Sequence, residues 1–375
     1  MIFLRWVSIL LVFISMTVEA RWGLNGLISG WTAAVEANPS CFAVGGRYLP
    51  RLWIISDLGT VSELSFRFDG SWESWGQALF SRGSRSVWQG KSRLFRCEAA
   101  LLGSQWDIHL GQQKLNFGSA VLLRPLRWFD NLDIRDPLQL TSGVWALVGR
   151  YVFLNNVNLR GWLMAGDTSH LAGSVAPAFN RGPEWGGRAQ IPWKSGEWAL
   201  TWHKRRVETV EESTHFLLDE YRGAIDAKWD WILGWWIEAM AAYQSQTGLT
   251  ARQWYSAATF GLDYTFAWGE GLRLTGEMML LKNSVSFWRR GTGNLLGALM
   301  ADYPLNLLDR ARAVVWIERR TGQCSYSIDW ERLYDRWRFS TILIRNPHSS
   351  DVFHGQSGLF QHTGWAFQFM FSYNY

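Results

Sequence analysis

The sequence predicts an all-β fold, a single-domain transmembrane antiparallel β-barrel of about 16–18 strands. Many short segments alternate strictly between apolar and polar residues, charged residues keep to one side of these segments, and 26 of the 375 residues are Trp. Tryptophan concentrates where one end of the side chain is apolar and the other is wet, as at a membrane surface. Strands that cross a bilayer must close into a barrel, because an open sheet edge leaves backbone groups unpaired in hydrocarbon.

Composition argues against other classes. Hydrophobic residues make up 48% of the chain and charged residues only 18%, so it is not intrinsically disordered. After residue 20, no charge-free apolar run approaches the roughly 20 residues that a spanning helix needs. A membrane protein built from helices is therefore excluded. The formal net charge of +5 is a weak indication of anionic partners.

The first 20 residues resemble a secretory signal peptide. Arg5 precedes an apolar stretch from Trp6 to Val18, and Val18-Glu19-Ala20 has a small-x-small cleavage pattern. We expect residues 1–20 to be removed after export, which leaves 21–375 as the barrel. An uncleaved membrane anchor is the alternative.

The C-terminal segment 365–375 shows the clearest alternation. Its odd positions are Trp365, Phe367, Phe369, Phe371, Tyr373 and Tyr375, and its even positions are Ala366, Gln368, Met370, Ser372 and Asn374. Successive side chains of a strand point to opposite faces. One face is therefore wholly aromatic, which is typical of a lipid-facing strand of a transmembrane barrel.

The same alternation recurs along the chain, for example over 197–206 and 260–268. A charged residue facing lipid costs about 2–4 kcal/mol at the bilayer midplane, so the charged residues of these strands are expected to face a hydrated lumen. Bacterial single-chain barrels have even strand numbers, which favours 16 or 18. Longer connections are expected at 76–90, 116–142, 167–184, 207–218, 282–293 and 346–361.

One segment resembles a known motif. Residues 111–137 read GQQKLNFGSAVLLRPLRWFDNLDIRDP, which is similar to a tract of large Gram-negative outer-membrane barrels of the porin and alginate-export-like superfamily. The matching residues are Gly111, Gln113, Gly118, Pro125, Phe129, Asn131, Asp136 and Pro137. Gln112, Phe117 and Arg127 depart from the pattern. The resemblance implies a Gram-negative outer-membrane barrel and does not identify a cargo.

The 116–137 stretch is too long and too rich in Asp and Pro for a periplasmic turn. We expect it to fold into the lumen, with Asp130, Asp133 and Asp136 facing basic residues across a constriction. A solvated extracellular loop is the alternative. The candidate pore-lining and constriction residues are Arg67, Arg96, Arg127, Asp130, Asp133, Asp136, Arg188, Arg205, Arg273 and Glu277.

Catalytic and metal-binding patterns are sparse, so we expect no enzyme, cofactor or metal site. The chain contains neither His-Glu-x-x-His nor Gly-x-Ser-x-Gly. Its best nucleophile–base pair is His354 with Ser357, which would suit a lipid-modifying enzyme. The three aspartates lack the alternate spacing of a calcium loop. Cys41, Cys97 and Cys324 form no Cys-x-x-Cys pair and are expected to be strand-borne thiols, with room for one disulfide.

Two functions remain open. The first is a porin-like channel for passive diffusion of small polar or anionic solutes, because inward-facing arginines would create a positive field. The second is a plugged, non-conducting barrel that acts as an outer-membrane anchor or as an export or assembly partner. Expected partners are outer-membrane lipid and lipopolysaccharide near the basic run 203–206, the barrel-assembly machinery through 365–375, and a small solute. Nucleic acid is not expected, and homo-oligomerisation stays open.

Overall fold

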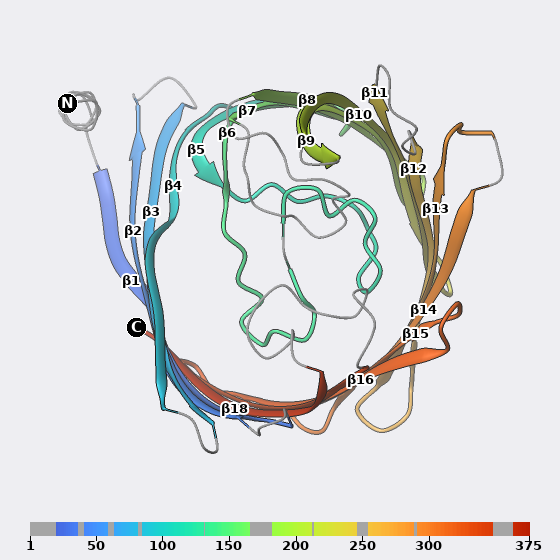
Figure 1. Ribbon diagram of the computed structural model, residues 1–375. Coiled ribbons are helices and arrows are strands. Elements are labelled where there is room, and N and C mark those ends of the chain that lie inside the picture. The colour runs from blue at the N-terminus through green and yellow to red at the C-terminus, as the bar shows by residue number, and fades with distance from the viewer. Residues whose placement is uncertain are drawn as a thin grey trace.

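The chain folds into one closed, 18-stranded antiparallel sheet (Figure 1). The computed structural model describes residues 20–36, 41–58, 64–81, 85–130, 132–165, 182–211, 214–245, 254–288, 291–347 and 363–375. The strands are β1 (Ala20–Val35), β2 (Cys41–Asp57), β3 (Ser65–Ser81), β4 (Val87–Leu102), β5 (Trp106–Gln113), β6 (Val144–Val152), β7 (Asn158–Ala165), β8 (Pro183–Trp193), β9 (Gly196–Glu211), β10 (Thr214–Asp230), β11 (Gly234–Ser245), β12 (Trp254–Phe266), β13 (Leu272–Ser284), β14 (Thr292–Pro304), β15 (Asp309–Glu318), β16 (Gln323–Leu333), β17 (Trp337–Asn346) and β18 (Gly364–Asn374).

Pairing between the first and last strands closes the barrel. β1 pairs with β2 on one side and with β18 on the other, in a register that runs from Leu27 opposite Asn374 to Val35 opposite Ala366. Every strand therefore has two neighbours, which satisfies the backbone hydrogen bonds that hydrocarbon cannot satisfy. The structure confirms the predicted barrel class and selects 18 strands from the expected 16 or 18.

The two ends of the barrel differ in their connections. The end that carries the start of β1 and the end of β18 has tight turns, such as 194–195 and 334–336. The opposite end has the long connections 114–143, 166–182 and 347–363. Transmembrane barrels have short periplasmic turns and longer extracellular loops, so the end with the termini is the periplasmic one.

Two of the expected long connections were wrong. The structure extends β3 to Ser81 and starts β4 at Val87, so most of 76–90 is strand. It likewise extends β9 to Glu211 and starts β10 at Thr214, so most of 207–218 is strand. Few apolar residues alternate in these segments, which contain glycines at 76 and 90 and acidic residues at 208, 211 and 212, so the period of two is weak there.

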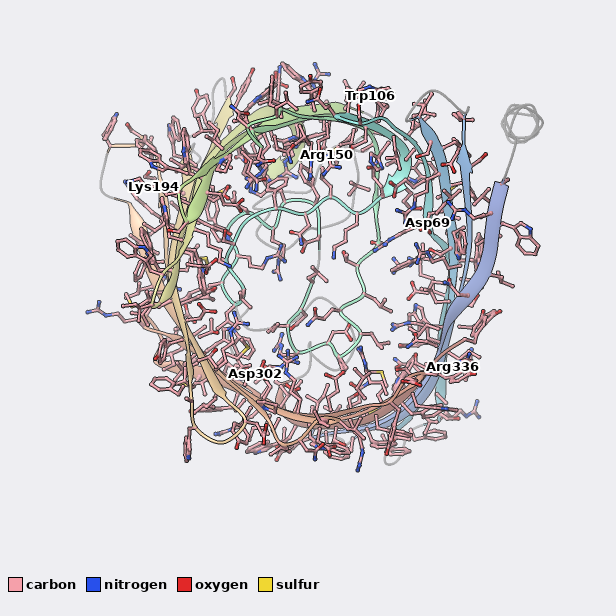
Figure 2. All side chains as sticks on the ribbon, turned by 180° about the vertical axis from the view of Figure 1, so that it is seen from behind. Asp69, Trp106, Arg150, Lys194, Asp302 and Arg336 are labelled. Carbon is pink, nitrogen blue, oxygen red and sulfur yellow. The ribbon has the colours of Figure 1, made fainter. Side chains whose placement is uncertain are left out.

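The alternation of side chains separates the outside of the barrel from its inside. In β18, Trp365 and Phe367 are exposed on the outside, whereas Ala366 and Ser372 are buried on the inside. Side chains project from both sides of the ring, and Asp69 and Arg150 lie on its inner side (Figure 2). Among the described residues, no helix has the length and apolar character needed to cross a membrane.

Candidate functional site: the lumen and its inner loop

Residues 114–143, which connect β5 to β6, lie inside the barrel (Figure 1). We call this segment the inner loop. It starts at the extracellular end of β5, crosses the interior and returns to β6. The predicted inward fold of this stretch is confirmed, and the solvated extracellular loop is excluded.

Two carboxylates of the wall hold the tip of the inner loop. Glu277 of β13 accepts hydrogen bonds from the backbone N–H groups of Val121 (2.6 Å), Leu122 (3.0 Å) and Leu123. Glu238 of β11 accepts one from Ala120 N–H at 2.6 Å. Consecutive N–H groups in a loop have no ladder partner, so a buried carboxylate is a strong acceptor for them.

Gly118 makes this close approach feasible. Its φ is +98°, and a Cβ atom there would stand 2.3 Å from Glu238 Oε1. Only glycine combines such a backbone conformation with this lack of space. The glycine of the motif is therefore required by the docking of the inner loop on β11.

Aromatic residues fix the ascending and returning parts of the inner loop. The Phe117 ring lies 5.7 Å from those of Trp128 and Trp162, and Phe129 lies 5.1 Å from His203. Trp162 of β7 donates from Nε1 to His203 Nδ1 (3.2 Å), and His203 Nε2 lies 3.1 Å from Glu184. The four aromatic residues, Phe117, Trp128, Phe129 and Trp162, belong to a buried apolar cluster between the inner loop and strands β6, β7, β11 and β12.

A third attachment lies across the lumen on β17. Arg338 donates to the Pro137 carbonyl oxygen at 2.8 Å, and Arg135 donates to Asn346 Oδ1 at 3.3 Å. Leu123 also packs in a buried cluster with residues of β14 and β15. The inner loop is thus tied to three sides of the barrel and occupies part of its interior.

Two aspartates of the inner loop pair with arginines of the same loop, which corrects one expectation for these two residues. Arg124 binds Asp130 through two hydrogen bonds of 2.9 Å, and Arg135 binds Asp133 at 2.7 Å and 2.9 Å. Asp130 and Asp133 therefore do not face arginines across a constriction. Two guanidinium groups close in sequence reach these carboxylates first, because the loop turns sharply around them.

Burial and these pairs shift the pKa values of loop residues. Burial raises the pKa of the Asp133 carboxyl, but Arg135 outweighs it and holds the pKa below its usual value. Burial raises the pKa of Asp136, despite the backbone hydrogen bond from Leu138. Burial and the charge of Arg124 both lower the pKa of Arg127, whose side chain donates to the Leu132 carbonyl oxygen.

Arginines outnumber carboxylates on the inner wall of β2–β10. Three carboxylates there are each shared by two arginines: Glu73 by Arg47 (3.0 Å) and Arg93 (2.7 Å), Asp69 by Arg51 (2.9 Å) and Arg67 (3.6 Å), and Glu220 by Arg205 and Arg222 (both 2.7 Å). Each such triad carries one net positive charge at neutral pH.

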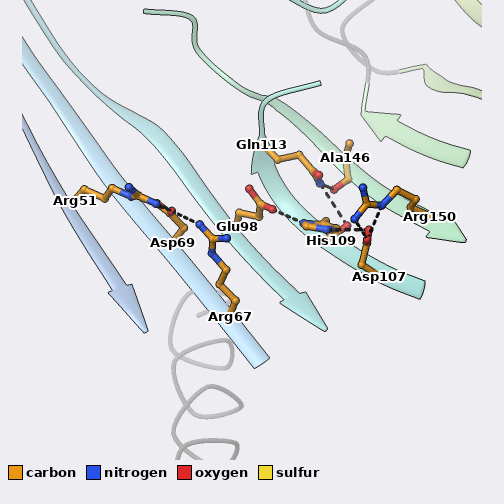
Figure 3. A network of polar contacts seen from close by, with 9 residues as sticks. All are labelled: Arg51, Arg67, Asp69, Glu98, Asp107, His109, Gln113, Ala146 and Arg150. Atoms are coloured by element: carbon orange, nitrogen blue, oxygen red, sulfur yellow. Dashed lines mark hydrogen bonds and ion pairs between the residues drawn. The ribbon is translucent and has the colours of Figure 1, made fainter. Parts of the chain in front are cut away.

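A row of three arginines continues this pattern. Arg150 of β6 is paired in register with Arg160 of β7, which is paired with Arg188 of β8. Arg150 binds Asp107 at 2.6 Å (Figure 3), and Arg188 binds Asp226 at 2.6 Å and 2.7 Å. Within the described part of the chain, Arg160 has no hydrogen bond or ion pair.

The opposite half of the wall is closer to neutral. Its charged residues pair one to one: Arg273 with Asp263, Arg310 with Asp302, Arg312 with Asp329, Arg332 with Asp309, and Arg338 with Glu331. Glu238 and Glu277 also lie on this half, where they bind the inner loop. The lumen therefore has a cationic side and a side whose charges largely cancel.

The candidate residues fall into three groups. Arg67, Arg188 and Arg205 lie on the cationic wall, as does Arg96, which stacks on Phe95 at 5.6 Å. Arg127, Asp130, Asp133, Asp136 and Glu277 belong to the inner loop or its anchor. Arg273 lies apart, near the periplasmic start of β13.

Several contributors were not among the candidates. Glu238, His203 and Trp162 hold the inner loop, and Arg160 completes the arginine row. Alternation could have placed their side chains inside the barrel. It could not have shown which of them the inner loop would touch.

Other chemistry finds little support in the described residues. They contain no cluster of three metal-ligating side chains, and Cys41, Cys97 and Cys324 are free. His354 and Ser357 lie outside the described residues. Residues 1–19 of the expected signal peptide also lie outside them.

Comparison with known proteins rests on structure alone, because no family model and no curated sequence matches the chain. OccK9 (OpdG) of Pseudomonas aeruginosa superposes with a TM-score of 0.58 at 13% identity, covering 96% of this chain and 99% of that one. OccK5 (OpdH) of the same species gives 0.57 at 10% identity, covering 96% and 98%. OccAB1 of Acinetobacter baumannii gives 0.55 at 9% identity, covering 96% and 97%.

These neighbours are Gram-negative outer-membrane porins. The chain has the fold of an outer-membrane porin. At such low identity the likeness shows the fold alone, and the expected relation to alginate-export-type barrels stays a prediction.

Proposed function

We propose that the chain is an outer-membrane channel for passive diffusion of small anionic solutes. The observation that carries this proposal is the excess of arginine on the wall of β2–β10, where three carboxylates are each shared by two arginines. A water-filled pore lined by one sign of charge raises the local concentration of ions of the opposite sign.

The arginine row places three guanidinium groups on adjacent strands of this wall. Among the described residues, Arg160 has neither a hydrogen bond nor an ion pair, and its neighbours Arg150 and Arg188 each bind a single carboxylate. A carboxylate or phosphate solute can exchange between such guanidinium groups, which bind both anions in a bidentate manner. Passage requires sites that are weak and multiple, which suits a row of similar residues.

The inner loop supports a second candidate. Its three attachments and its apolar cluster with β6 and β7 suit a plug as well as a constriction. The alternative is therefore a non-conducting barrel that serves as an anchor or as an export or assembly partner.

Liposome swelling separates the two functions. Liposomes with the folded protein are diluted into a small carboxylate or into an uncharged solute of similar size. We expect swelling in both solutes, and faster swelling in the carboxylate. Swelling no faster than in protein-free liposomes would overturn the channel and favour the plugged barrel. Faster swelling in the uncharged solute would overturn the anion preference alone.

A further inference from the structure

The basic run 203–206 divides between the two faces of the barrel. His203 and Arg205 are buried on the inner wall of β9, whereas Lys204 and Arg206 point outward, on the same face as the exposed Trp202. This follows from the period of two in a strand. Two cations therefore lie on the surface that elsewhere faces lipid.

These cations form a compact group with two residues of β10. Lys204 Nζ lies 3.2 Å from Asp219 Oδ2 and 5.1 Å from the centre of the Tyr221 ring. Arg206 Nε lies 3.3 Å from Asp219 Oδ1, and its side chain is 56% exposed. We call Lys204, Arg206, Asp219 and Tyr221 the outer cation patch. One carboxylate shared by two cations leaves a net positive charge.

The position of the outer cation patch sets its surroundings. β9 runs toward the extracellular end, and Trp198, Leu200 and Trp202 precede the patch on the same face. A cation that faces lipid costs about 2–4 kcal/mol at the midplane but about 0–1 kcal/mol near the interface. Trp185 packs edge-on against Trp202 at 4.8 Å, and such aromatic girdles mark the interface. The patch therefore lies at the headgroup level of the outer leaflet.

We propose that the outer cation patch binds a phosphate of the phosphorylated glycolipid, lipid A, that forms the outer leaflet. The exposed guanidinium of Arg206 presents a planar set of donors that fits a phosphate. The Lys204 ammonium lies over the Tyr221 ring and shares Asp219 with Arg206. Acyl chains of the same lipid would lie on the tryptophans below. This proposal does not depend on whether the barrel conducts.

Native mass spectrometry of the detergent-purified barrel tests the proposal. The probes are bisphosphorylated lipid A, its phosphate-free derivative and phosphatidylglycerol. The variants are Arg206→Gln and the double variant Lys204→Gln/Arg206→Gln. Arg336→Gln is the matched control, because Arg336 is also beside an outward-facing tyrosine, at 3.4 Å from Tyr373 Oη, but lies in a periplasmic turn. Heat-modifiable gel migration checks that each variant folds.

Removal of one cation near the lipid headgroups is expected to change the affinity for an anionic lipid about fivefold. We expect Arg206→Gln to weaken lipid A binding about fivefold and the double variant about thirtyfold, with Arg336→Gln within twofold of the wild type. The phosphate-free derivative should bind all variants equally. The proposal would be overturned if Arg336→Gln lost as much affinity for lipid A as Arg206→Gln, or if the double variant bound lipid A as tightly as the wild type. It would also be overturned if phosphatidylglycerol bound as tightly as lipid A and its binding weakened equally in the variants.

Discussion

Replacing Glu277 by glutamine should release the tip of the inner loop. Each carboxylate oxygen of Glu277 accepts two hydrogen bonds: Oε1 from Val121 N–H and the Trp236 indole, and Oε2 from Leu122 and Leu123 N–H. The side chain is 3% exposed, so water does not compete for these bonds. Glutamine keeps one acceptor oxygen. Its NH₂ group replaces the second oxygen and faces the two N–H donors that this oxygen accepted from.

The size of the effect follows from the two bonds lost. Hydrogen bonds to a charged group contribute about 1.5–3 kcal/mol each, so docking of the tip weakens by about 3–6 kcal/mol. Each 1.4 kcal/mol is a factor of ten, so the ratio of docked to released tip falls by about two to four orders of magnitude. The attachments through Glu238 and Arg338 remain, so the release is local.

Single-channel recording in planar bilayers measures this release. We expect Glu277→Gln to show larger or more frequently fluctuating currents than the wild type. Asp302→Asn is the control, because it removes one negative charge from the neighbouring strand β14, where Asp302 pairs with Arg310. Current traces for Glu277→Gln that match the wild type would refute the anchoring role. The same change in Asp302→Asn would assign the effect to charge.

Three further outcomes are expected. Arg160→Gln should lower the ratio of anion to cation permeability about twofold, since the variant removes a positive charge that has no ion pair among the described residues. A permeability ratio from bi-ionic potentials that equals the wild-type ratio would contradict a role of the arginine row. Because burial raises the pKa of Asp136, acidification protonates this loop carboxylate at a higher pH than an ordinary aspartate and should increase anion preference. Asp136→Asn should lose this pH dependence, and a wild-type pH profile in this variant would contradict the role of Asp136. Leu299→Arg places a charge at an exposed position in the middle of β14 and should lower the free energy of unfolding in lipid by about 2–4 kcal/mol, measured by urea unfolding. Leu299→Ala should lower this free energy by less. Equal free energies of unfolding for the two variants would show that this face does not contact lipid.

The sequence was sufficient for the barrel because the period of two is a local signal. The aromatic face of 365–375 became the outer face of β18 as predicted, and the aspartate- and proline-rich 116–137 stretch folds inward. The alternation of apolar and polar residues follows from which face of each strand is buried, so it can be recognised without knowing which distant residues the strand contacts.

The lumen was less predictable because its contacts join residues far apart in the chain. Glu277 was recognised as an inward residue, but its hydrogen bonds to residues 121–123 depend on how the inner loop crosses the barrel. The same holds for Asp130 and Asp133, which could have met arginines of the wall and instead meet Arg124 and Arg135. Their charge and their odd or even position in the strand predict that such residues lie inside the barrel. Their partners depend on the path of the inner loop.

The reversal potential across a bilayer with a potassium chloride gradient is the most direct test of an arginine-rich, water-filled lumen. We expect a potential whose sign shows chloride to be more permeant than potassium, and which weakens at high salt because ions screen the wall. A measurable current with potassium as the more permeant ion would contradict the anionic channel. No current at all from folded protein would contradict the channel itself.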